Sequence, residues 1–206
     1  MTRYKEDRAF TDYVHKNLAV PIIYSKMNWK PVVCSTTYTD QRDKKDGIDY
    51  QAIDSSGLKV TIQERFRDVY AKNYNDFTIR YTRKFSLRPE EQKSEWYKID
   101  ATYLIYGITN GKKFADARNT LTNFIKYIVV DLNQVKNLFR KGVIKIPNNF
   151  ANSSLITVEE GRHVLYTAKK ENLDYSSEFI AIDPNKLIEV IGSSINDVVL
   201  CQKGFY

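Results

Sequence analysis

Cysteine and histidine are scarce in this sequence. It has two residues of each type, and neither a CxxC pair nor a cluster of cysteine with histidine occurs: Cys34, Cys201, His15 and His163. This scarcity gives no support to a zinc site or a disulfide framework, and it is typical of a reducing cytoplasm. We interpret the two histidines as ordinary surface or packing residues.

Long apolar runs and common catalytic motifs are also missing. No stretch approaches the roughly 20 apolar residues that cross a bilayer, and the first residues are charged and mixed, unlike a secretory signal. We therefore expect a cytoplasmic protein without membrane association. The absence of GxSxG, GxGxxG, P-loop and HExxH motifs argues against serine hydrolase, dinucleotide-binding, NTPase and zincin chemistry.

The sequence is instead rich in basic and aromatic residues. Its 206 residues include 32 Lys and Arg against 25 Asp and Glu, a net charge of +7, together with 15 tyrosines and 10 phenylalanines. The aromatic residues are interleaved with the basic ones, which favours a polyanionic partner, nucleic acid above all. A solvated lysine-rich surface is the alternative interpretation.

Apolar periodicity predicts a mixed α/β domain with a largely continuous sheet. A helix is expected over residues 4–18, ended by Pro21, with extended chain on both sides of residue 28. Further along, the patterns predict these elements: a hairpin over 47–66, strands over 76–85, 99–109 and 127–132, a short helix after Pro89, and helices over 112–127 and 133–142, the last with Asn133 as N-cap. Short strands and turns follow. We expect one domain over residues 1–206, with a core of about 4–132 and a C-terminal elaboration of about 133–206.

The second strand of the hairpin carries polar residues where apolar ones are expected. In "VTIQERF", residues 60–66, alternation places Gln63 and Arg65 on one face and Glu64 on the other. The turn lies about midway between positions 49 and 63, so the neighbour of Gln63 and Arg65 on the first strand can be Asp49 or Tyr50. We expect Asp49, Gln63 and Arg65 to lie together. A carboxylate beside two polar side chains at a strand edge is the arrangement of a hard-cation site.

Three other interpretations of this hairpin remain open. Asp49 can cap a turn or form an ordinary ion pair with Arg65, and Gln63 can be a buried amide with satisfied hydrogen bonds. A register shifted by one residue would make Glu64 the metal ligand, although it would then share a face with apolar side chains.

The segments "DGIDY" and "VTIQERF" resemble the core motif of the PD-(D/E)XK nuclease superfamily, which includes restriction endonucleases. The resemblance implies a restriction-endonuclease-like fold, with a mixed central sheet flanked by helices and extra C-terminal strands. It implies that Mg²⁺ or Mn²⁺ is held by Asp49, by Gln63 in the glutamine variant of the motif, and by an acid of the first helix. That acid is Glu6 or Asp7, with Asp12 less favoured.

Arg65 stands where the family has lysine. Lysine can shed a proton or hold a water molecule, whereas arginine stays charged and clamps phosphate. Lys98 is a candidate for a migrated lysine. Further basic residues would contact phosphates along the cleft: Arg67, Arg80, Lys84 and Lys45.

The resemblance implies a metal-dependent DNA endonuclease of restriction, host defence or a phage. Cutting both strands would imply a homodimer, because one site cuts one strand. The alternative is the same fold with a weakened site, acting as a DNA-binding module or as a protein-binding inhibitor. DNA is favoured over RNA as the partner, and RNA cleavage is a third interpretation.

Overall fold

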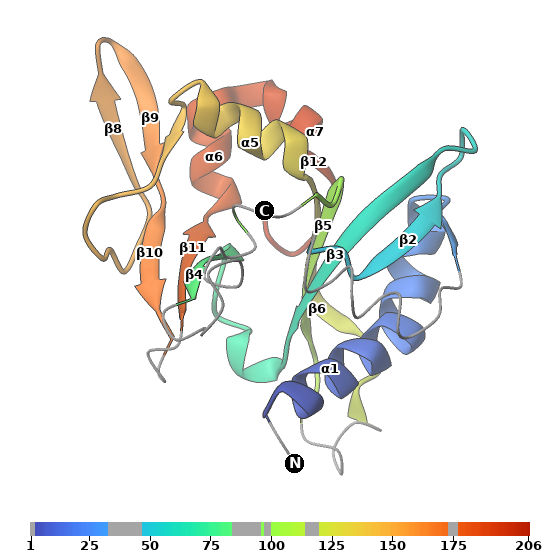
Figure 1. Ribbon diagram of the computed structural model, residues 1–206. Helices are drawn as coiled ribbons and strands as arrows, with labels where there is room; N and C mark the ends of the chain where they lie inside the picture. Colours follow the sequence, from blue (N-terminus) through green and yellow to red (C-terminus); the bar gives the residue numbers. More distant parts are fainter. Residues whose placement is uncertain (1–2, 33–46, 84–95, 97–99, 114–119, 173–176) are drawn as a thin grey trace.

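The computed structural model describes residues 3–32, 47–83, 96, 100–113, 120–172 and 177–206. The protein has a mixed α/β fold around a six-stranded central sheet, in which the strands follow the order β1-β2-β3-β5-β6-β12 (Figure 1). These strands are β1 (Lys30–Pro31), β2 (Tyr50–Ile53), β3 (Lys59–Arg67), β5 (Tyr103–Thr109), β6 (Phe124–Asp131) and β12 (Val199–Lys203). Strands β3 and β5 are parallel and the other neighbours are antiparallel, so the sheet is mixed.

The predicted hairpin is formed by β2 and β3. Its turn is stabilised by Asp54, whose Oδ1 atom accepts hydrogen bonds from the backbone N–H groups of Ser56 and Leu58. Gly57 adopts a φ of 84° there, a conformation that suits glycine. The hairpin prediction is therefore confirmed, including the residues that make the turn.

One face of the central sheet is covered by the first helix, drawn in blue in Figure 1. The helix runs through α1 (Arg3–Val14) and continues as the π-helix η1 (His15–Tyr24). Its apolar side chains pack with those of β3, β5 and β6 in one core cluster that includes Phe10, Val14, Leu18, Ile62, Phe66 and Ile105. The predicted end of the helix at Pro21 is wrong, because the chain stays helical to Tyr24. The proline removes one backbone donor, while Ile23 and Tyr24 after it are fully buried.

The other face of the central sheet is covered by later elements. A second sheet of order β10-β11-β4 and a third of order β7-β9-β8 lie on this side with the remaining helices. Their bounds are β4 (Phe77–Arg83), β7 (Ile144–Lys145), β8 (Leu155–Glu159), β9 (Arg162–Tyr166), β10 (Ala168–Glu171), β11 (Ser177–Ile182), η2 (Val69–Ala71), α5 (Leu132–Arg140), α6 (Pro184–Ile191), η4 (Gly192–Ser194) and α7 (Ile195–Val198). The expected continuous sheet is wrong, because β4 leaves the central sheet and pairs with β11.

Two further local predictions are corrected. Residues 124–127 are expected in a helix but begin β6, because the strand pairs with β5 on one side and with β12 on the other. The N-cap of α5 is Asp131, and not Asn133, since the Asp131 carboxylate accepts hydrogen bonds from the N–H groups of Asn133 and Gln134. The helix expected after Pro89 falls almost wholly outside the described residues.

Within the described ranges, no helix is both long and apolar enough to cross a membrane.

Candidate functional site

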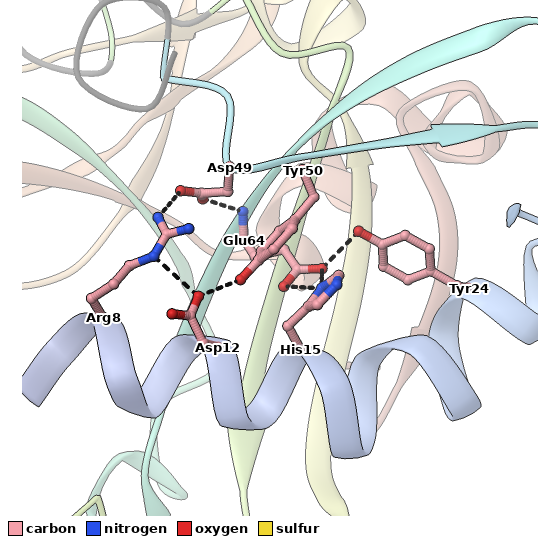
Figure 2. A network of polar contacts seen from close by, with 7 residues as sticks. All are labelled: Arg8, Asp12, His15, Tyr24, Asp49, Tyr50 and Glu64. Atoms are coloured by element: carbon pink, nitrogen blue, oxygen red, sulfur yellow. Dashed lines mark hydrogen bonds and ion pairs between the residues drawn. The ribbon is translucent and has the colours of Figure 1, made fainter. Parts of the chain in front are cut away.

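A network of polar side chains joins α1 and η1 to the hairpin (Figure 2). On the helix, Arg8, Asp12 and His15 follow one another at spacings of four and three residues, so they share the face that looks toward the sheet. Asp49, Tyr50 and Glu64 meet them from the hairpin. The network therefore connects segments that are about 40 residues or more apart in the sequence.

The Asp49 carboxylate is buried at the start of the hairpin, one residue before β2. Its Oδ2 atom accepts a hydrogen bond of 2.8 Å from the backbone N–H of Glu64. Its Oδ1 atom lies 3.4 Å from Nη1 of Arg8, and the Nε atom of Arg8 lies 3.0 Å from Oδ1 of Asp12. Arg8 thus bridges two acids and offsets part of their negative charge.

The Glu64 side chain has no exposed surface. The Nδ1 atom of His15 lies 3.0 Å from each carboxylate oxygen, and the Tyr24 hydroxyl donates a hydrogen bond of 2.8 Å to Oε1. Burial, followed by the charge of Glu64, raises the pKa of Tyr24 and keeps this hydroxyl a donor. A buried carboxylate needs such donors, because an unpaired one would be strongly destabilising.

Tyr50 connects the two halves of the network. Its ring stacks on the imidazole of His15, with centroids 3.6 Å apart and planes 3° from parallel. Its hydroxyl donates a hydrogen bond of 2.7 Å to Asp12. Burial is the largest cause that raises the pKa of Tyr50, and the charge of Glu64 is the next. The hydroxyl therefore keeps its proton at neutral pH.

The structure separates the residues that the sequence grouped. In the parallel pairing of β3 with β5, Gln63 and Arg65 stand beside Leu104 and Tyr106, which belong to the core on the side away from α1. The carboxylate of Asp49 reaches Arg8 on the α1 side. The expected grouping of Asp49 with Gln63 and Arg65 is therefore wrong. The reason is that Asp49 precedes β2, so strand alternation does not fix the direction of its side chain.

Glu64 lies on the face that alternation predicted, together with Ile62 and Phe66. The prediction did not anticipate that the helix places polar donors on this same face. The acid that α1 contributes to the network is Asp12. Glu6 is exposed, and it lies two residues before Arg8, roughly 200° around the helix.

The remaining predicted residues lie apart from the network. Asp7 forms an ion pair with Lys113. Arg67 ends β3 beside the second sheet, and Arg80 belongs to β4 within that sheet. Lys45, Lys84 and Lys98 fall outside the described residues. Individual roles for these side chains stay predictions.

The network does not fit a magnesium site. Among the residues that the structure describes, no group of three or more His, Cys, Asp and Glu side chains could hold a metal ion. The oxygens of Asp49 and Glu64 instead face donors from the protein itself, which are Arg8, a backbone N–H, His15 and Tyr24. A divalent cation prefers carboxylate oxygens that are free to bind it.

The sequence contains a pattern on the first helix that indicates this network, and the alternation along the hairpin strands does not show it. Arg8, Asp12 and His15 form a polar line on a helix whose neighbouring positions, Phe10 and Val14, are buried. Such a line on a buried helix needs polar partners. No family model, curated protein or solved structure matches the chain.

Proposed function

We propose that this chain is a DNA-binding protein with a restriction-endonuclease-like core, in which the hairpin network stabilises the fold and does not cut. The observation that carries the proposal is that both hairpin carboxylates are already bound by donors of the protein itself. Asp49 and Glu64 accept hydrogen bonds or ion pairs from Arg8, His15, Tyr24 and a backbone N–H. Carboxylates held in this way neutralise protein cations and support packing of the helix on the sheet.

The DNA-binding part of the proposal is supported by charge and by the resemblance of the hairpin. The net charge of +7 attracts a polyanion over a range set by salt screening. A helix packed on a mixed sheet that includes the hairpin supports the proposal of a restriction-endonuclease-like core. DNA is the natural partner of that core.

A metal-dependent DNA endonuclease is the second candidate, and one observation favours it. The carboxylates of Asp49 and Glu64 contact Arg8 and His15, so two acids of the hairpin lie on the side covered by the first helix, where Asp12 is also present. The resemblance likewise implies acids on a hairpin and on the first helix, with Glu64 and Asp12 here in place of Gln63 and of Glu6 or Asp7.

Binding and cleavage assays separate the two candidates. Purified protein is titrated into labelled duplex DNA at two salt concentrations, and supercoiled plasmid is incubated with it in Mg²⁺, Mn²⁺ or EDTA. We expect salt-sensitive binding and an intact plasmid under all three conditions. Cutting that needs Mg²⁺ or Mn²⁺ and is lost in Asp49→Asn would overturn the proposal in favour of the endonuclease. Asp197→Asn, an exposed acid of α7, is the matched control. No binding to DNA at low salt would refute both candidates.

A further inference from the structure

A cleft of about 720 Å³ opens between the central sheet and the second sheet. It lies on the face of the central sheet away from α1, because Tyr106 of β5 lines it and belongs to the core on that side. The rest of its walls is formed by the segment after β3, by Phe150 and Asn152 between β7 and β8, and by strands β4, β10 and β11. Its volume is in the range of sites that bind small molecules or nucleotides.

Aromatic rings are exposed along this cleft. Tyr70, Tyr74 and Phe150 line it with 67%, 55% and 55% of their surface exposed. Among the described residues, the one other large aromatic side chain that is exposed is Tyr206, at 45%. Exposed rings gathered in one concave place indicate a binding surface, since single exposed apolar residues are common but clusters are not.

Lysine ammonium groups lie next to these rings. The Nζ atom of Lys170 is 5.7 Å from the centroid of the Tyr74 ring, and that of Lys169 is 5.5 Å from the centroid of Phe150. Lys112 lies similarly over Tyr70, at 5.9 Å. Rings for stacking with cations beside them are what a strand of unpaired nucleotides requires, because each base is followed by a phosphate.

The wall of the cleft offers polar groups to the edge of a base. Thr78 is only 5% exposed, and its hydroxyl finds no hydrogen-bond partner among the described residues. Asp76 also lines the cleft: its Oδ2 atom lies 4.0 Å from the Nζ atom of Lys170, and its carboxylate can accept hydrogen bonds from amino and imino groups. A buried hydroxyl without a partner is destabilising, so a ligand that supplies one is favoured.

The mixed charge of the lining argues against a duplex backbone as the ligand. Asp68, Asp76 and Glu171 line the cleft together with Arg67, Lys169 and Lys170. A surface that follows duplex phosphates is mainly basic. Acidic side chains among the basic ones suit bases, whose edges carry hydrogen-bond donors.

We propose that this cleft binds unpaired nucleotides of single-stranded DNA, with bases stacked on Tyr74 and Phe150 and phosphates next to Lys169 and Lys170. The proposal deepens the DNA-binding function proposed above and rests on it. It also places nucleotide binding and stabilisation of the fold at different sites, since the network of α1 and the hairpin lies on the other face of the central sheet.

The test is fluorescence anisotropy with a labelled oligo-dT of about 12 nucleotides, alongside a labelled duplex and an oligo-rU of equal length. Tyr74→Ala and Phe150→Ala should each weaken oligo-dT binding about 5-fold to 100-fold, because each removes one stacking surface. Tyr74→Phe keeps the ring and should bind as the wild type does. Tyr206→Ala, an exposed tyrosine outside the cleft, is the matched control. Lys170→Gln should lower the slope of log affinity against log salt by about 0.7.

The outcomes distinguish this proposal from the proposed function. If the wild type binds the duplex but not oligo-dT, or if Tyr74→Ala and Phe150→Ala bind oligo-dT as the wild type does, the cleft proposal fails while DNA binding stands. Binding of oligo-rU without oligo-dT overturns the choice of DNA. If neither duplex nor oligo-dT is bound, the proposed function fails as well. Circular dichroism of each variant shows that a loss of binding is not a loss of folding.

Discussion

Removal of His15 should destabilise the protein strongly, because it leaves the buried carboxylate of Glu64 without its main donor. The Glu64 side chain is fully buried, and His15 contacts both oxygens at 3.0 Å. After His15→Ala, Tyr24 would be the one side-chain donor left among the described residues that contact this carboxylate. Leaving a buried acceptor without such a donor costs about 1–3 kcal/mol, and more when the acceptor is charged. That is a large part of the roughly 5–15 kcal/mol that stabilises a typical domain.

A double-mutant cycle measures how much of this loss comes from the pair itself. Glu64→Gln removes the charge and should cost about 1–3 kcal/mol, because the amide cannot accept all the same hydrogen bonds. His15→Ala combined with Glu64→Gln should cost less than the sum of the single changes, by roughly 0.5–3 kcal/mol. Urea unfolding at pH 7 gives each free energy of unfolding, and an unchanged m-value shows that the comparison is valid.

The matched control is His163→Ala, which alters an exposed histidine and should change stability by less than about 0.5 kcal/mol. The reasoning is refuted if His15→Ala costs less than about 1 kcal/mol, or if the two single changes simply add. Either result would mean that Glu64 is not held by His15 in the folded protein.

Three other substitutions test different parts of the structure. Burial raises the pKa of Asp76, so its carboxyl binds a proton more readily in the folded chain than in the unfolded chain. The free energy of unfolding should therefore fall as the pH rises from the ordinary pKa of 3.8 toward the higher pKa that Asp76 has in the folded chain. Asp76→Asn should remove this fall, which urea unfolding between pH 4 and 7 measures. If the wild type and Asp76→Asn gave parallel profiles of stability against pH, the prediction would be contradicted. Gly107→Ala would place a Cβ atom 2.6 Å from the ring of Phe124, and should lower the melting temperature through a loss of about 1–3 kcal/mol. Asp131→Ala removes the N-cap of α5 and should cost about 0.5–2 kcal/mol in the same melts; an unchanged melting temperature would count against either account.

Local sequence patterns were sufficient for much of the secondary structure. The hairpin was predictable because Asp54 and Gly57 determine its turn through short-range hydrogen bonds and backbone conformation. The strand at 103–109 was predictable from its β-branched and aromatic residues. The end of the first helix was not, because a proline limits one hydrogen bond while packing against the sheet acts on the whole segment.

The beginning of β6 shows a second limit of local patterns. Apolar residues around Phe124 fit helical spacing as well as a strand, and pairing with β5 and β12 decides between the two. The same holds for β4. Its local sequence pattern favours a strand, but pairing with β11 determines that this strand belongs to the second sheet.

For the candidate site, the sequence by itself determined that Asp49 and Glu64 belong to one hairpin, and that Glu64 shares a face with Ile62 and Phe66. Alternation along a strand is a local property, so it can be read from the sequence. Only the tertiary structure decided that the acids meet Arg8, His15 and Tyr24. Those donors come from positions about 40 to 50 residues away, as the separations of 40 for Tyr24 and 49 for His15 from Glu64 show. They reach the acids because the apolar face of the helix is buried on the sheet, which carries the polar line of Arg8, Asp12 and His15 to the hairpin.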